Sequence, residues 1–306
     1  MIFTTEIYNE LVKQYNLGYP IKKAEQFEYR GYGGTRRSGI KFLYTNEELL
    51  EYSKCVNDIV YFIEKYCKIM TPNGMAQIKL FDFQKEVLKN YQENRFNILF
   101  TSRQVGITSL MSLIFLHYMT FNIDKTITCM DIINKYNKQF LEKIKNSYQC
   151  LPFFLKQGII KWSNRILEFE NGCRIFTMTS GKNLAIGCNI DNFFISNFSR
   201  IKHKKIIYDS LIPIITAIKN TKFIIQSGPN GYDFFYELVL GSERFEGDPD
   251  KNIFKTQRIY WWQVPGRDEK WKEEMIKLYG IEVWHEEFDL NFVTYWIEKE
   301  NKKRKK

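Results

Sequence analysis

The residues of this chain best suited to chemistry form a short loop at positions 102–109, with the sequence Ser-Arg-Gln-Val-Gly-Ile-Thr-Ser. A loop of this type binds phosphate through its backbone amides, while a hydroxyl residue holds Mg²⁺ and a lysine contacts the β- and γ-phosphates. The lysine position, between the last glycine and the hydroxyl residue, is occupied by Ile107. Isoleucine supplies no charge, so the loop predicts a triphosphate site whose chemistry is impaired.

The chain around this loop alternates between predicted strands and predicted helices. Residues 97–101 form a short apolar strand that leads into the loop, and residues 109–121 form an apolar helix that follows it. Further strands are predicted at 126–130, 192–195 and 222–226, further helices at 135–149 and 206–218, and a two-residue hairpin at Asn171-Gly172 between 166–169 and 174–178. Buried strands separated by helices indicate an α/β fold with a mainly parallel central sheet. In such folds an anionic ligand binds at the first strand-to-helix turn.

The N-terminal part is predicted to begin with a short helix in residues 1–27, followed by a loop rich in glycine and arginine at 28–40. A helix is expected to open at Thr45, with Glu47 and Glu48 in its first turn. Arginines 30, 36 and 37 of the loop could contact phosphates, or the loop could be a solvated arm. Tyr260, Trp261 and Trp262 could stack on bases, or they could form a strand that enters the core.

The composition favours an anionic partner. The chain has 45 Lys and Arg against 35 Asp and Glu, for a net charge of +10. Nucleic acid fits this excess, although an A/T-rich coding sequence would also raise the lysine content. The N-terminus has no signal-peptide pattern, and no apolar run is long enough to span a bilayer, so we expect a protein that is not secreted and has no membrane partner. The six cysteines and three histidines show no metal-ligand spacing, and no metal site is predicted.

Residues 99–108 resemble the Walker A segment of large terminase subunits, the DNA-packaging ATPases of tailed phages; in the T-even-like group this segment runs Ser-Arg-Gln-x-Gly-Lys-Thr. Further blocks resemble the same family, in the family's order: 57–66, 79–88, 151–162, 224–236, 263–271 and 287–292. The resemblance covers about residues 45–292. It implies a RecA-like P-loop NTPase fold with a small N-terminal lid subdomain.

The resemblance also implies a domain organisation. It gives an N-terminal arm at 1–44, a terminase-like ATPase domain at 45–292 and a basic tail at 293–306. Within the ATPase domain the lid region spans 45–78 and the RecA-like core spans 79–292. Family members continue into a nuclease domain, which we expect to be absent because the chain stops where that domain would begin.

The resemblance assigns roles residue by residue. The nucleotide-binding positions are Gln84, Ser102, Arg103, Gln104, Gly106 and Thr108. Gln84 matches an adenine-contacting glutamine and Arg103 an arginine that stabilises γ-phosphate charge; the alternatives are a solvated helix residue and a salt bridge. The Walker B Asp and Glu fall on Ser196 and Asn197, and the coupling segment falls on Gln226, Ser227 and Gly228. With Ile107 also degenerate, no catalytic residue is intact except the retained Arg103. Losing one such charged group costs about 10²–10⁵ in rate, so we expect hydrolysis to be impaired.

These features predict the ATPase domain of a viral DNA-packaging motor that is impaired in hydrolysis, a pseudo-ATPase without nuclease. We expect ATP and Mg²⁺ to bind weakly or not at all. The expected partners are double-stranded DNA, other terminase subunits and a portal or procapsid, in the cytoplasm of the host cell. The alternatives are an active packaging ATPase with unorthodox catalytic residues and a separate nuclease chain, a non-catalytic DNA- or portal-binding structural module, and a decayed copy.

Overall fold

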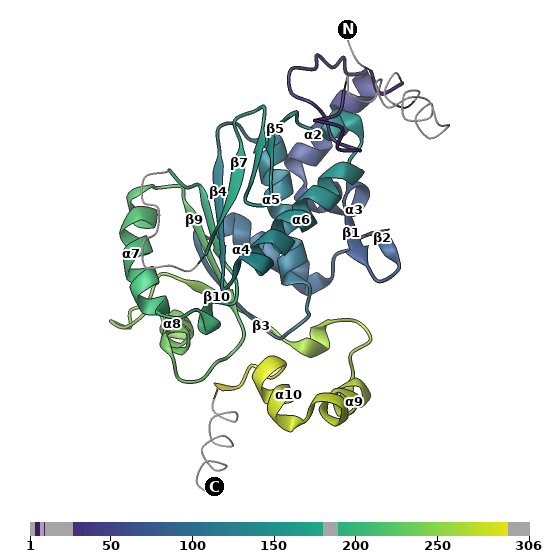
Figure 1. Ribbon diagram of the computed structural model, residues 1–306. Helices are drawn as coiled ribbons and strands as arrows, with labels where there is room; N and C mark the ends of the chain where they lie inside the picture. Colours follow the sequence, from purple (N-terminus) through teal and green to yellow (C-terminus); the bar gives the residue numbers. More distant parts are fainter. Residues whose placement is uncertain (1–3, 7–8, 10–26, 180–188, 293–306) are drawn as a thin grey trace, which may run out of the picture. The chain divides into compact units, whose positions relative to one another are not determined.

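The computed structural model describes residues 4–6, 9, 27–179 and 189–292 (Figure 1). The chain divides into two compact units. Unit 1 contains Met1–Leu80, Thr108–Ile127 and Asn137–Thr177, and unit 2 contains Phe81–Ile107, Thr128–Tyr136 and Met178–Lys306. Most of the predicted N-terminal helix and the whole basic tail at 293–306 lie outside the described residues. The predicted boundary between lid and core, at 78/79, stays a prediction.

Unit 2 contains the parallel part of the sheet. Its strands are β3 (Phe96–Thr101), β8 (Asn192–Ile195), β9 (Lys222–Ser227), β10 (Lys255–Ile259) and most of β4 (Thr126–Asp131), in the order β10-β3-β9-β8-β4. β3 pairs in parallel with both β10 and β9, and β8 pairs in parallel with β9. The central strands of a parallel sheet are covered on both faces, and β3, β8 and β9 are accordingly largely buried. The prediction of an α/β fold with a mainly parallel sheet is confirmed.

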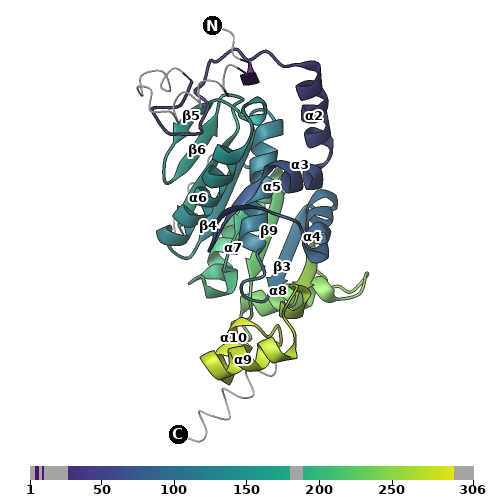
Figure 2. The same cartoon turned by 90° about the vertical axis from the view of Figure 1, so that its right-hand side faces the viewer.

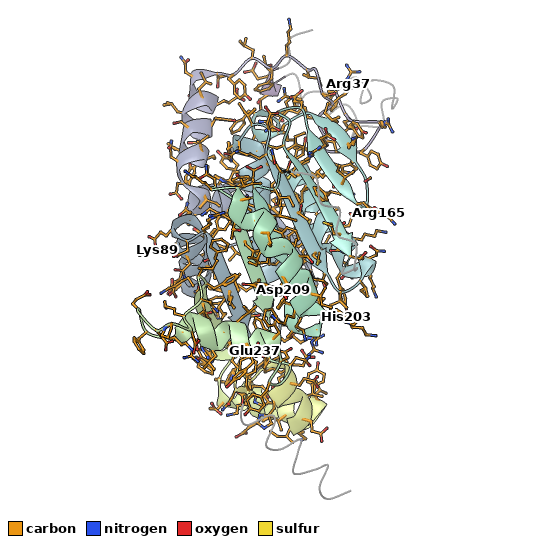
Figure 3. The ribbon with its side chains drawn as sticks, turned by 90° about the vertical axis from the view of Figure 1, so that its left-hand side faces the viewer. Arg37, Lys89, Arg165, His203, Asp209 and Glu237 are labelled. Atoms are coloured by element: carbon orange, nitrogen blue, oxygen red, sulfur yellow. The ribbon has the colours of Figure 1, made fainter. Side chains whose placement is uncertain are left out.

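The helices of unit 2 are α4 (Asp82–Glu93), α7 (Lys204–Ala217), α8 (Phe234–Glu243), α9 (Glu269–Tyr279) and α10 (Ile281–Glu287). Figure 1 shows α7 and α8 to the left of the strands and α4 to the right. In Figure 3, His203 marks the start of α7 and Asp209 lies farther along it. The core beneath α7 and α8 is built from the apolar side chains of β3, β8 and β9, including Phe100, Phe193 and Phe223.

Unit 1 is mainly helical, with short antiparallel strands. Its elements are α2 (Asn46–Asn57), α3 (Ile59–Tyr66), β1 (Lys68–Thr71), β2 (Gly74–Gln77), most of α5 (Ile107–Phe121) and α6 (Asn134–Cys150), β5 (Ile159–Trp162), β6 (Ile166–Phe169) and most of β7 (Arg174–Thr179). α2 opens at Thr45 as predicted, because Thr45 accepts from the Glu48 amide and the Glu48 carboxylate accepts from the Thr45 amide. No helix in the described ranges is long and apolar enough to cross a membrane.

The predicted hairpin between β6 and β7 is present, but its turn is not a two-residue turn. The Gly172 amide donates to Phe169 O at 3.1 Å, and Gly172 alone in the turn has a left-handed φ of +79°. A two-residue type I′ turn would need positive φ at both central residues, whereas Asn171 has none. The loop therefore has three residues, a β-turn over Glu170 and Asn171 followed by the left-handed glycine, and the Phe169 amide donates to Cys173 O at 2.9 Å where the strands close.

A partly buried histidine in unit 1 makes the stability of the fold depend on pH. His117 Nε2 lies 2.8 Å from Cys55 O, and burial lowers the pKa of the imidazole from 6.5 to about 4. Since the folded-state pKa lies below the unfolded value, the contribution is complete above pH 6.5 and is lost as pH falls towards 4. We expect about 2.5 kcal/mol of the unfolding free energy to be lost between pH 7 and pH 4.5 through this residue. Urea unfolding at both pH values measures the loss. His117→Gln keeps a donor for Cys55 O and should reduce the difference in unfolding free energy between pH 7 and pH 4.5 by this amount. An unchanged difference would contradict the assignment to His117.

Candidate phosphate-binding site

The loop between β3 and α5 has the backbone shape of an anion-binding turn. Gln104 and Gly106 both have left-handed φ values, +60° and +83°. Left-handed residues inside such a turn direct successive backbone amides to one side, which forms a concave site for an anion. Gly106 is required by its φ and also by its surroundings, since a Cβ there would lie 3.1 Å from Gln84 Nε2.

Gln84 lies against this loop, as its position beside Gly106 shows. The side chain is 3% exposed, and its Oε1 accepts from the Phe81 amide at 3.1 Å at the start of α4. The alternative that Gln84 is a solvated helix residue is therefore wrong. Whether its amide contacts an adenine stays a prediction.

Ile107 is the first residue of α5 and is buried, with 3% of its surface exposed. The position that a lysine would use to reach the phosphates is therefore filled by an apolar side chain packed inside the protein. Burial of this side chain stabilises the fold but offers nothing to an anion.

Polar side chains meet where β3, β9 and β8 end. Gln226, on β9, donates through Nε2 to Thr101 Oγ1 at 2.7 Å. Its Oε1 accepts from Ser196 Oγ at 3.2 Å and from the Asn197 amide at 3.4 Å. Ser196 and Asn197, the residues at the predicted Walker B positions, therefore interact with the predicted coupling segment. This arrangement joins three strand ends through hydrogen bonds between uncharged side chains.

The second residue of the coupling segment makes a further contact with the chain after β8. Ser227 Oγ donates to Ser199 Oγ at 2.6 Å and accepts from the Ser199 amide at 3.0 Å. A Cβ on Gly228 would lie 3.4 Å from Thr101 O, so this glycine lies close to the end of β3. The three coupling residues are thus brought together with the ends of β3 and β8.

A carboxylate that the sequence analysis missed lies beside the predicted Walker B positions. Asp131 is the last residue of β4, and Asn197 Nδ2 donates to both of its carboxylate oxygens at 3.1 Å. Burial raises the pKa of this carboxyl, while the Ile132 amide and the side chains of Asn197 and Ser196 act against that rise. The acid lies on the strand next to β8, so a search restricted to β8 could not find it.

Arg103 extends from the loop and forms the predicted alternative, a salt bridge. Its Nη1 lies 2.7 Å from Glu287 Oε1, and its backbone amide donates to Glu287 O at 2.7 Å. Arg267 donates to the carbonyl of Gln104 at 2.8 Å and to that of Arg103 at 3.4 Å. Ser102 Oγ donates to Phe288 O at 2.6 Å. Figures 1 and 2 show the helix pair α9 and α10 at this end of β3, so the C-terminal segment of unit 2 holds the loop.

The three arginines of the N-terminal loop differ in their surroundings. Arg36 is buried, and its guanidinium donates to Lys156 O at 2.7 Å and Ile40 O at 2.8 Å and pairs with Glu170 at 3.3 Å. The interpretation of the whole loop as a solvated arm is therefore wrong at Arg36. Arg30 and Arg37 are exposed, and Figure 3 shows Arg37 at the surface.

The aromatic run after β10 is not a strand. β10 ends at Ile259, and the Tyr260 amide donates to Gln263 Oε1 at 2.7 Å, which caps a short helical turn. The predicted strand at 260–262 is therefore wrong. Trp261 is buried with Trp284, whereas Trp262 is exposed and stacks on Tyr260 with ring centroids 4.2 Å apart.

Within the described ranges, no group of three or more His, Cys, Asp or Glu side chains is placed to hold a metal ion. The acid nearest the predicted Walker B positions, Asp131, shares its oxygens with the Asn197 amide group. The loop itself has backbone donors suited to an anion.

Comparison with known proteins identifies relatives of this fold. The family model described as terminase large subunit, T4likevirus-type, N-terminal, matches residues 98–301. The large terminase ATPase domain of Thermus phage P74-26 is similar in structure, with a TM-score of 0.57, 14% identity, and coverage of 70% of this chain and 94% of that one.

Two longer structures are also similar. The large terminase of bacteriophage HK97 gives a TM-score of 0.59 at 14% identity, covering 77% of this chain and 54% of that one. The large terminase of the thermophilic bacteriophage D6E, in complex with ATP-γ-S, gives a TM-score of 0.52 at 12% identity, covering 70% and 53%. This chain therefore matches about half the length of the HK97 and D6E proteins.

Proposed function

This chain belongs to the T4-type family of terminase large subunits, and we propose that it is a packaging-motor ATPase domain that has lost efficient hydrolysis. Its RecA-like fold is that of the phage large terminase ATPase domains. The proposal concerns what this domain still does with nucleotide.

One observation carries the proposal: charged side chains are missing both at the lysine position of the loop and at the two predicted Walker B positions after β8. Ile107 is buried at the lysine position, and Ser196 and Asn197 use their side chains for hydrogen bonds to neighbouring strands. Phosphoryl transfer depends mainly on positioning and on stabilising the charge of the transferred group. A site without these charges retains the shape of the cradle but loses most of its catalytic power.

Nucleotide binding is supported only for the phosphate side of the site. The left-handed Gln104 and Gly106, and the buried Gln84 beside them, fit a phosphate loop with an adjacent amide. The D6E relative has structures in complex with ATP-γ-S and with ADP. We infer weak nucleotide binding.

A specific observation favours a second candidate, an active ATPase with an unorthodox acid. Asp131 lies at the end of β4 and contacts Asn197, so its carboxylate is placed one strand from where the family has its acidic pair. Burial raises its pKa, which is the direction expected for a group that accepts protons near neutral pH.

A phosphate-release assay with ATP, Mg²⁺ and duplex DNA separates the two candidates. We expect turnover below about 0.1 s⁻¹, at least a hundredfold under the typical enzyme value of about 10 s⁻¹. Arg103→Ala, which removes the one retained charged group of the loop, should release phosphate at the same background rate as the parent, because the site contributes little hydrolysis. DNA-stimulated turnover that disappears in Asp131→Asn would instead establish the second candidate and contradict the first.

The remaining partners are also proposals. The net charge of +10 supports double-stranded DNA, and family membership supports other terminase subunits and a portal or procapsid. We assign no nuclease chemistry to the described residues. Salt-dependent retention on DNA without any response to ATP would favour the non-catalytic DNA- or portal-binding module.

A further inference from the structure

Two arginines from different parts of unit 2 converge on one oxygen atom. Arg103 Nη1 lies 2.7 Å from Glu287 Oε1, and Arg200 Nη2 lies 2.9 Å from the same oxygen. Arg103 belongs to the phosphate loop, whereas Arg200 ends the short helical turn at Phe198–Arg200 that follows β8. One anion can therefore contact both guanidinium groups, although Arg103 and Arg200 are 97 positions apart in the chain.

Arg103 and Arg200 form a site for an anion, and the Glu287 carboxylate occupies that site. Two cations face the Glu287 carboxylate, and Glu286 Oε1 is 3.8 Å from Arg200. The Arg103 side chain is 57% exposed and that of Arg200 is 36% exposed, so both remain accessible from solvent, while Glu287 is 18% exposed. Guanidinium groups bind carboxylate and phosphate oxygens with the same geometry.

The position favours the terminal phosphates of a nucleoside triphosphate. Arg103 is adjacent to the left-handed Gln104 of the cradle, and Arg200 lies beyond the end of β8, at the side where Ser196 and Asn197 contact Gln226. The cation that the loop lost at Ile107 would have contacted the same phosphates. A second arginine at this side restores one positive charge without a lysine.

The Glu287 carboxylate can leave without releasing the loop. The Arg103 amide donates to the backbone oxygen of Glu287, and Ser102 Oγ donates to that of Phe288. These bonds do not use the carboxylate. A terminal phosphate carries more negative charge than a carboxylate, so it competes well for the two arginines.

We propose that Arg103 and Arg200 together bind the terminal phosphates of a nucleoside triphosphate in place of the missing loop lysine, and that Glu287 occupies this arginine pair until the ligand displaces it. The proposal rests on the nucleotide site proposed above. It makes Glu287 an internal competitor and Arg200 a binding residue.

Isothermal titration with inorganic tripolyphosphate and with ATP tests the proposal on the full chain. Glu287→Gln removes the competing charge and keeps the backbone contact, so it should tighten tripolyphosphate binding about tenfold. Arg200→Gln should weaken it about tenfold, and Arg200→Lys, which keeps the charge, should retain most of the affinity. The matched control is Arg244→Gln, because Arg244 is 37% exposed and also pairs with two carboxylates, those of Asp248 and Asp250; its affinity should stay within twofold.

The outcomes separate this proposal from the proposed function. If ATP binds and both Glu287→Gln and Arg200→Gln stay within twofold of the parent, the arginine pair is structural and this inference is wrong, while the nucleotide site stands. If tripolyphosphate responds as expected but ATP binds to no variant, the arginine pair is an anion site, and both the nucleotide function and the assignment of this pair to a nucleoside triphosphate are wrong. If neither ligand binds to any variant, both fail.

Two further measurements exclude simpler explanations. A salt bridge that only tethers α10 predicts a lower unfolding temperature in Arg200→Gln with unchanged tripolyphosphate affinity, which would overturn the proposal. A loss of duplex DNA retention in Arg200→Gln as large as the loss of tripolyphosphate binding would make this a DNA-backbone site and would also overturn it. We expect DNA retention to be unchanged.

Discussion

Ile107→Lys combined with Ser196→Asp and Asn197→Glu is expected to raise the affinity for ATP in the presence of Mg²⁺ by at least about a hundredfold. The lysine would contact the β- and γ-phosphates, and the two carboxylates would bind the metal's water shell and orient the attacking water. Titration calorimetry with ATP, with and without Mg²⁺, measures the gain. The part of the gain that the two carboxylates supply should require Mg²⁺, whereas the part that the lysine supplies through its direct phosphate contacts should remain without the metal.

The surroundings of the three positions oppose the introduction of charged side chains. Ile107 and Ser196 are buried, so the new charges must extend to the surface or meet a ligand. Asn197 donates to both oxygens of Asp131, and a glutamate at position 197 would place a second carboxylate against them. Like charges at this distance raise the pKa of one group and destabilise the fold. The triple variant should therefore be less stable than the parent, and adding Asp131→Asn should recover stability without loss of affinity.

An uncharged control separates charge from shape. Ile107→Met with Ser196→Asn and Asn197→Gln changes the same positions by similar volumes and should leave ATP affinity within about twofold of the parent. If the charged variant binds ATP no more tightly than this control, the assignment of the three positions is wrong.

The fold could be predicted because its signals are local in the sequence. The apolar runs of β3, β8 and β9 and the helix after the loop were each recognisable from a few neighbouring residues, and the structure has all of them. The strand expected at 260–262 is wrong because the turn there depends on a hydrogen bond from the Tyr260 amide to the side chain of Gln263, within an aromatic run of a composition typical of strands.

The site was only partly predictable, because its contacts join residues that are distant in the chain. The loop's degeneracy at Ile107 is visible in the sequence alone. Neither the contact of Asp131 with Asn197 nor that of Arg200 with Glu287 has a local signal, since each pair comes from separate elements. The burial of Gln84 could not be predicted either, since its polar type is typical of an exposed helix position.

The N-terminal loop shows most clearly that contacts between distant residues cannot be predicted from residue type. Arg36 and Arg37 are adjacent and chemically identical, yet only Arg36 turns inward, where it donates to two backbone carbonyls and pairs with Glu170. Its guanidinium also lies over the Phe153 ring, 5.6 Å from the centroid. The tertiary structure, rather than the residue type, decides which arginine is structural.

Arg36→Ala is accordingly expected to lower the unfolding free energy by about 3 kcal/mol. The substitution removes the guanidinium donor from the carbonyls of Ile40 and Lys156 and the ion pair from Glu170. Glu170 keeps the Gly39 and Gly158 amides as donors at 2.9 and 3.0 Å, which holds the loss below that of a wholly unpaired buried charge. Chemical denaturation measures the change. Arg37→Ala, in which an exposed side chain is removed, should cost less than about 0.5 kcal/mol. Equal losses in the two variants would mean that the buried contacts of Arg36 do not stabilise unit 1, and the loop would then be the solvated arm that its composition suggests.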